Sequence, residues 1–213
     1  MLIRTVDIDC SDPAAQLKGE KNMTGSTFRR LLPALALVAA AVVPVASHAV
    51  DVRPMLKAGF DFGGDKLITV IFADGSTKSI NANEGLYFGG GVSILSDSKD
   101  IETEVSLSYK TTGINASNGS VDWTRFPLEV LVFYRLPQFR LGGGLTYHLS
   151  PKLSGSGVTS VNLTFDNSAG FVLQADYLLQ KITVGLRYTS LEYKLGGGSV
   201  KSDGVGVTFG ISF

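Results

Sequence analysis

The chain has 213 residues, which is enough for one domain and a targeting segment. It carries 19 basic and 19 acidic side chains, and this balance does not favour a nucleic-acid partner held through its phosphates. The composition includes 25 glycines, 12 phenylalanines and 7 tyrosines but only 7 prolines, and it is rich in residues that build and punctuate β-strands.

Residues 23–49 have the three parts of a secretory signal peptide. Two arginines at 29–30 give a positive start, residues 31–46 are apolar, and Ser-His-Ala at 47–49 places small residues before a cut. The alternative is a transmembrane helix. However, the apolar stretch is interrupted by two prolines and is shorter than the roughly 20 residues that a spanning helix needs.

Residues 1–22 precede this signal and are polar and unpatterned. The simplest interpretation is an upstream extension assigned in error, with translation beginning at Met23; a functional N-terminal extension is the alternative. A cut after Ala49 would remove the single cysteine, Cys10, and leave one histidine, His148. We therefore expect no disulfide, no metal site and no cofactor, because a zinc site needs several nitrogen or sulfur ligands together.

From Val50 onward, apolar residues alternate with polar ones at a period of two, which is typical of half-buried strands. In the stretch 101–110, for example, odd positions are mostly apolar and even positions are polar. Each predicted strand has the length of about ten residues that a tilted strand needs to cross a bilayer. Eight such strands are predicted, near 52–62, 85–95, 100–111, 124–135, 138–149, 169–179, 181–193 and 204–213.

The connections between these strands alternate between short and long. Short turns follow the second, fourth and sixth strands, at 96–99, 136–137 and 180. Long polar connections follow the odd strands, at 63–84, 112–123, 150–168 and 194–203. This rhythm is typical of a closed antiparallel up-and-down transmembrane β-barrel, with short turns on the periplasmic side and long loops outside.

The connection 63–84 contains a hairpin signal of its own. Residues 67–72 are apolar, and Asp74-Gly75 is a favoured turn dipeptide. The return arm, 77–81, is too short to cross a membrane, so we expect a hairpin that stands above the barrel. A ten-stranded barrel is the alternative.

Two bands of aromatic residues lie on the face that we predict to be outward. This is the pattern of the interfacial girdles of membrane barrels, whereas in a soluble barrel the same side chains would fill the core. The residues are Phe62, Tyr109, Phe126, Tyr147, Phe171 and Tyr188 toward the long loops, and Tyr134, Phe139, Tyr177 and Phe213 toward the short turns.

Charged residues gather on the opposite face. An eight-stranded barrel is only wide enough for side chains to fill its interior, so these charges must pair. A narrow ion path lined by the same residues is the alternative. The residues are Lys57, Asp61, Glu102, Glu104, Lys110, Arg125, Glu129, Arg135, Arg140, His148, Asp176 and Arg187.

The last strand, GVGVTFGISF, ends on Phe213 with apolar residues at alternate positions. Together with the signal peptide and the strand rhythm, this ending resembles the small outer-membrane β-barrel superfamily, most closely the OmpA-like and OmpX-like eight-stranded barrels. The resemblance covers residues 50–213. It implies location in the outer membrane, contact with its lipid and lipopolysaccharide, and recognition of the C-terminal strand by the barrel assembly machinery.

Three functions remain open from the sequence. The first is a non-enzymatic surface protein whose polar loops contact an unknown external ligand, since loops on a rigid scaffold usually carry binding. The second is a narrow, porin-like channel. The third is a lipid A-modifying enzyme, because His148-Leu149-Ser150 resembles the His-x-Ser of lipid A deacylases. That motif departs from the family at Pro151, and His148 is predicted to face inward, so we assign no catalytic, cofactor-binding or metal-binding residue.

Overall fold

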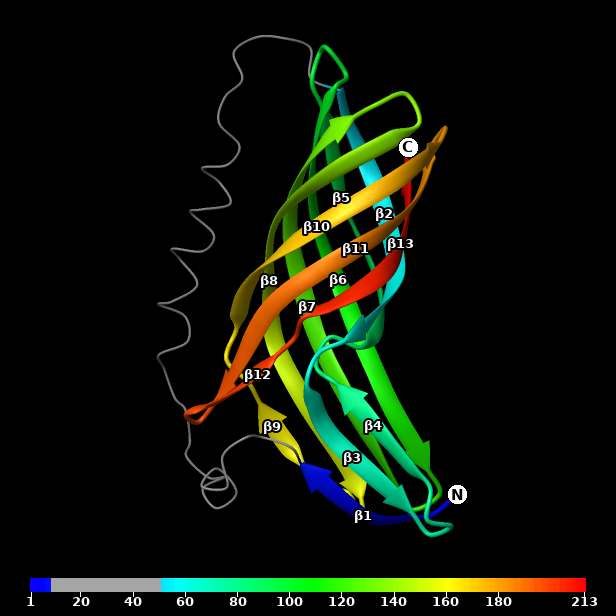
Figure 1. Cartoon of the computed structure of the whole chain (residues 1–213), viewed down its shortest axis with the longest axis vertical. Coiled ribbons are helices and arrows are strands. Elements are labelled where there is room, and N and C mark those ends of the chain that lie inside the picture. Colours follow the sequence, from blue (N-terminus) through cyan, green and yellow to red (C-terminus); the bar gives the residue numbers. More distant parts are fainter. Residues whose placement is uncertain (9–50) are drawn as a thin grey trace.

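The computed structural model describes residues 1–8 and 51–213, which form strands and turns (Figure 1). The predicted signal peptide and Cys10 lie outside the described residues, so a mature chain beginning at Val50 stays a prediction. Within the described ranges, no helix is long and apolar enough to cross a membrane.

Eight strands pair in a closed antiparallel ring in which each strand pairs with its neighbours and the last pairs with the first. The ring closes where Ser212 of the last strand pairs with Met55 of the first, and the pairing continues to Gly204 opposite Gly63. The eight-stranded barrel predicted from the sequence is therefore confirmed, and the ten-stranded alternative is wrong. In ring order the strands are β2 (Asp51–Gly63), β5 (Gly85–Leu95), β6 (Ile101–Ala116), β7 (Gly119–Arg135), β8 (Phe139–Gly157), β10 (Ser168–Leu179), β11 (Ile182–Leu195) and β13 (Gly204–Ser212).

The predicted short turns gather at one end of the barrel, which we call the turn end (Figure 1). They connect β5 to β6, β7 to β8 and β10 to β11. Lys99 and Gln180 in two of these turns adopt left-handed backbone conformations, with φ of 61° and 55°. The barrel begins and finishes at this end, where the amide of Phe213 donates to the carbonyl of Pro54.

The opposite end, which we call the cap end, differs from the prediction of long polar loops. β6 and β7 run on to a tight turn at 117–118, and β8 continues to Gly157, so most of the predicted loops 112–123 and 150–168 is strand. The short strand β9 (Asn162–Thr164) pairs with β8, and β12 (Gly198–Lys201) pairs with β11. The strands extend because their inward residues there are apolar and bury one another.

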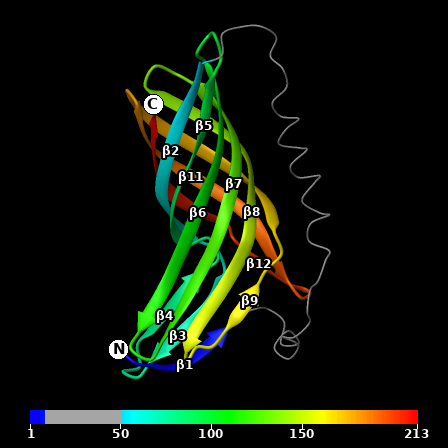
Figure 2. The same ribbon diagram turned by 180° about the vertical axis from the view of Figure 1, so that it is seen from behind.

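A second, three-stranded sheet lies at the cap end, in front of β6 and β7 in Figure 1 and behind them in Figure 2. The predicted hairpin is confirmed as β3 (Lys66–Phe72) and β4 (Thr77–Asn81), which pair with each other and not with the ring. The other edge of β3 pairs with β1 (Ile3–Ile8), a strand from residues 1–22, which we interpreted as an upstream extension.

Two kinds of interior follow from this arrangement. The cap end has an apolar core that includes Leu67, Ile80, Trp123, Phe165 and Tyr193. The ring between the cap and the turn end encloses mainly charged and polar side chains, together with a small apolar cluster of Leu131, Phe133 and Val172.

Candidate functional site

The twelve inward-facing residues predicted from strand parity all point into the barrel. Eleven of them are 5% exposed or less, and only the Arg135 side chain, at 23%, reaches solvent at the turn end. Their outward neighbours are exposed and apolar; Leu107, for example, is 49% exposed while Glu104 on the same strand is 2% exposed. The face assignment made from the sequence therefore agrees with the structure.

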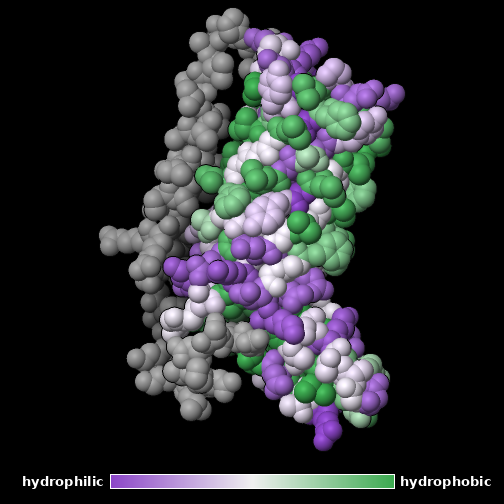
Figure 3. All heavy atoms as spheres, in the orientation of Figure 1, coloured by the Kyte–Doolittle hydropathy of each residue, from purple (hydrophilic) through white to green (hydrophobic). Residues whose placement is uncertain are grey.

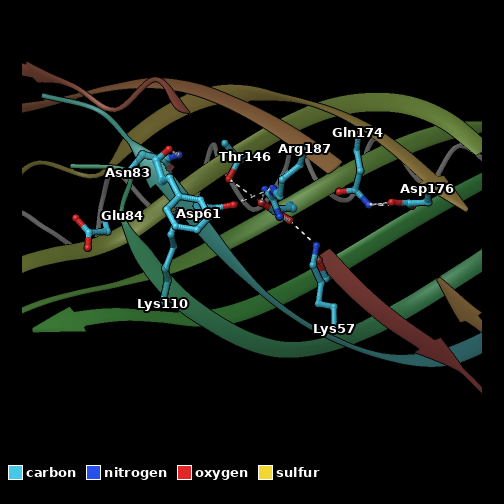
Figure 4. Close-up of polar contacts among 12 residues, drawn as sticks. Lys57, Asp61, Asn83, Glu84, Lys110, Thr146, Gln174, Asp176 and Arg187 are labelled. Carbon is cyan, nitrogen blue, oxygen red and sulfur yellow. Dashed lines mark hydrogen bonds and ion pairs between the residues drawn. The ribbon is translucent and has the colours of Figure 1, made fainter. Parts of the chain in front are cut away.

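A first ion-pair cluster occupies the middle of the barrel (Figure 4). Glu129 of β7 receives the ammonium of Lys57 at 2.5 Å and the guanidinium of Arg187. Lys110 pairs with Asp61 at 2.5 Å and also donates to the side-chain oxygen of Asn83 at 3.1 Å. Strands that are not neighbours in the ring are thus joined through its interior.

A second cluster lies nearer the turn end and is centred on Arg140. Its guanidinium contacts three carboxylates, Glu104 at 2.5 Å, Asp176 at 2.7 Å and Glu102 at 2.9 Å, and Arg135 shares Glu102. Gln174 donates to both oxygens of Asp176, at 3.0 and 2.9 Å. The two guanidiniums therefore face three buried carboxylates, and only Arg135 reaches solvent.

Two inward glycines make room for buried carboxylates. A Cβ at Gly185 would lie 1.8 Å from the Oδ1 atom of Asp176, and a Cβ at Gly206 would lie 1.8 Å from the Oδ1 atom of Asp61. Any larger residue would displace these carboxylates, so the glycines on neighbouring strands belong to the charged site.

Arg125 is the exception to the expected ion pairing. Among the described residues no carboxylate forms a salt bridge with it. Its Nη2 atom instead donates to the backbone carbonyls of Asn83 and Glu84, both at 2.9 Å, and its guanidinium lies over the Trp123 ring. The Trp123 indole in turn donates to the carbonyl of Ala82 at 3.0 Å. The segment 82–84, which joins the β3–β4 hairpin to β5, is thereby bonded to the lumen-facing side chains of β7.

The sequence did not point to residues 82–84, because their role rests on backbone carbonyls that carry no residue-type signal. Asn83, which is fully buried, donates to the carbonyl of Phe62 at 3.2 Å and accepts from Lys110. Ala82, the first residue of this segment, belongs to the apolar core of the cap. The only available signal was the apolar stretch 67–72, which we read as part of a free-standing hairpin.

The His148-x-Ser150 pair is not assembled as a nucleophile and base. His148 is buried in the lumen, where its Nδ1 atom hydrogen-bonds the hydroxyl of Tyr193. Burial raises the pKa of the Tyr193 phenol, so the phenol keeps its proton and can donate it. Ser150 is exposed and has a φ of 48°, a left-handed kink close to the point where the β7–β8 register shifts. This kink breaks the alternation that would otherwise place the two side chains on one face.

The charged interior leaves little free space. One cavity, lined by Asp61, Tyr87, Ser108, Lys110 and neighbouring groups, has a volume of about 10 Å³, which is about one water molecule. Within residues 1–8 and 51–213, no group of three or more histidine, cysteine or acidic side chains is placed to hold a metal ion.

No family model and no curated protein matches this chain. Solved structures of similar fold include the attachment invasion locus protein Ail of Yersinia pestis in complex with the heparin analogue sucrose octasulfate, at 12% identity and a TM-score of 0.48, covering 76% of this chain and 97% of that chain. Neisserial surface protein A is 9% identical, with a TM-score of 0.49 and coverage of 78% and 100%. The N-terminal β-barrel domain of Pseudomonas aeruginosa OprF is 14% identical, with a TM-score of 0.40 and coverage of 76% and 97%.

These three are small outer-membrane barrels, the class that the sequence resembles. At these identities and TM-scores, the assignment of a role depends on the geometry of this chain's own residues.

Proposed function

We propose that this protein spans the outer membrane of a Gram-negative bacterium as a non-enzymatic barrel with a closed, charge-paired lumen. Its cap end would face outward and make contact with external molecules. The observation that carries the proposal is the inverted polarity of the ring, which is charged inside and apolar outside.

The outer surface has the composition that hydrocarbon requires. On β7 the outward residues from Phe126 to Tyr134 are all apolar, over the roughly 9–11 residues that a tilted strand needs to cross a bilayer. Leu145 and Leu186 on other strands are 62% and 67% exposed, which would be costly in water. Figure 3 shows apolar residues gathered over the barrel strands and polar residues at the cap end. A soluble barrel would have the opposite arrangement.

Closure of the ring supports the same location. In a membrane every backbone amide and carbonyl must be bonded within the protein, and the eight paired strands achieve this without a free edge. The short turns would then lie in the periplasm, with lipid and lipopolysaccharide around the outward residues. We further propose that the assembly machinery recognises the last strand, which ends on the exposed Phe213.

The packed interior favours a closed barrel over a channel. Ion pairs cross the lumen in two clusters, segment 82–84 is bonded across its mouth, and the apolar cap covers that segment. Opening a path for ions would require separating charges that are out of contact with water, which is costly.

A planar-bilayer recording on refolded protein tests this proposal. We expect no unitary conductance steps from the heat-modifiable, folded protein, while a porin added to the same bilayer provides the positive control. Reproducible steps that depend on folded protein would favour the narrow channel instead.

The enzyme alternative has weaker support, because His148 and Ser150 lie on opposite sides of the barrel wall. Mass spectrometry of lipid A incubated with the folded barrel provides the test: we expect its acyl chains to be unchanged.

A further inference from the structure

Strand β1 is bonded to β3 along one edge, and on its other edge it is bonded at its beginning. One edge pairs with β3 in antiparallel fashion, from Ile3 opposite Phe72 to Ile8 opposite Ile68, with a register shift between Ile3 and Thr5. The amide of Ala73 also donates to the carbonyl of Leu2 at 2.7 Å. The other edge meets the turn between β6 and β7, where the amide of Ser117 donates to the carbonyl of Met1 at 3.0 Å. We call the edge of β3 together with residues 117–118 the strand site.

Asn118 binds the backbone of β1 from this turn as a neighbouring strand would. Its side-chain oxygen accepts from the amide of Ile3 at 2.8 Å, and its side-chain nitrogen donates to the carbonyl of the same residue at 2.9 Å. Both hydrogen bonds are made to main-chain groups and do not depend on the side chain at that position. The strand site therefore recognises an extended peptide by its backbone, as in strand-addition complexes.

The apolar core of the cap determines which side chains the strand site accepts. Ile3 is 5% exposed and belongs to the cap core, and Val6 and Ile8 pack against that core from one side of the strand. Arg4 and Asp7 point to solvent. The site thus selects aliphatic residues at the positions of Ile3, Val6 and Ile8 and tolerates charge between them.

Processing determines whether this segment stays in place. A chain cut after Ala49, as the signal peptide predicts, lacks β1, whereas all eight ring strands lie between residues 51 and 212 and close without it. The edge of β3 would then present unpaired amides and carbonyls beside an apolar surface, and such an edge is a template for another strand.

We propose that in the processed protein the strand site binds an extended segment of a partner protein that has aliphatic residues spaced like those of β1. This inference rests on the proposed function, because it requires the cap end to be accessible from outside the cell. It specifies the chemistry of the contact: a proline-free peptide added as a strand to β3 and held by Asn118.

The test uses the peptide MLIRTVDI, residues 1–8 of this chain, labelled with a fluorophore at its carboxyl end. Fluorescence anisotropy is measured with refolded residues 50–213 in detergent micelles, and heat-modifiable migration on a gel verifies folding in each sample. We expect saturable binding to residues 50–213. The full 213-residue chain should bind at least tenfold more weakly, because its own β1 occupies the site.

Matched variants separate strand addition from nonspecific adsorption. Asn118→Ala should weaken binding at least tenfold, whereas Asn167→Ala, which alters an amide at the same end that bonds Ser150 instead, should leave it unchanged. In the peptide, Val6→Pro and Ile3→Asp should abolish binding and Arg4→Ala should not.

Two outcomes would overturn the proposal. The first is a folded barrel that does not bind the peptide, or that binds the proline variant equally well. The second is a concentration-dependent dimer of residues 50–213 that Asn118→Ala does not affect, because it would mean that β3 pairs with a second copy instead. A sample that fails the gel test or conducts ions would count against the proposed function and not against strand binding.

Discussion

Arg140 is the centre of the ion-pair cluster nearer the turn end, and its replacement gives the sharpest test of charge pairing. It is 2% exposed and contacts Glu102, Glu104 and Asp176. In Arg140→Gln, Glu102 retains Arg135, but Glu104 loses the one ion pair that it makes within the described residues. Removing one partner of a buried pair costs about 3–5 kcal/mol, and we expect a loss of that size in the free energy of unfolding.

Glu104→Gln is the matched control, because it removes a negative charge from the same cluster from which Arg140→Gln removes a positive one. Two guanidiniums, Arg135 and Arg140, then face two carboxylates, Glu102 and Asp176. An amide at position 104 can still hydrogen-bond Arg140, so the expected cost is about 1 kcal/mol or less. The substitution leaves Arg125 and Arg187 unaffected, because Glu104 pairs with Arg140, whereas Arg187 pairs with Glu129 and Arg125 bonds the carbonyl of Asn83.

Urea-induced unfolding in lipid vesicles measures both variants. Trp123 is the single tryptophan and is buried beside Arg125, so its fluorescence reports the folded state without added label. Arg140→Lys, which retains the charge but not the planar fork, should fall between wild type and Arg140→Gln. Equal losses for Glu104→Gln and Arg140→Gln would refute the reasoning, since the three carboxylates would then not compete for two cations.

Three further predictions test the faces, the assembly signal and processing. Leu107→Arg should destabilise the barrel by about 2–4 kcal/mol, because the exposed Leu107 would face lipid. A lipid-soluble quencher should reach a cysteine introduced at position 107 but not one at position 104. The reverse pattern would mean that the strand is inside out. Deleting Phe213 should preserve export but reduce the yield of heat-modifiable barrel, and an unchanged yield would argue against its role in assembly. Mass spectrometry of outer-membrane fractions should find Val50 at the mature N-terminus; peptides containing Arg29 in folded protein would contradict cleavage.

The ring could be predicted from the sequence because a membrane barrel repeats one simple constraint. Every strand must be apolar outward and polar inward, so alternation in stretches such as 101–110 determined both the strand and its face. The short turns fixed the order of the strands. The strand ends at the cap could not be found in this way, because residues such as Ile114 and Val121 are apolar and buried within the cap core, where the alternation of the ring is lost.

The partners within the lumen were also beyond the sequence. Parity places Glu104 and Arg140 inside, but which charges meet depends on strand tilt and stagger around the ring. The anchoring of Arg125 to the carbonyls of Asn83 and Glu84 left no trace in residue type. The left-handed backbone at Ser150 similarly separated two side chains that an unbroken strand would have placed together.

The two ion clusters are paired unequally, so the net charge of the side chains inside the lumen changes sign along the barrel axis. Toward the cap, four cations (Lys57, Lys110, Arg125 and Arg187) face two carboxylates (Asp61 and Glu129), whereas toward the turn end two cations face three carboxylates. An ion of either sign therefore meets one half of the lumen that repels it. In the orientation proposed above, the more positive half of the lumen would lie nearer the leaflet that carries the phosphates of lipopolysaccharide, and electrostatic attraction would favour that orientation during insertion.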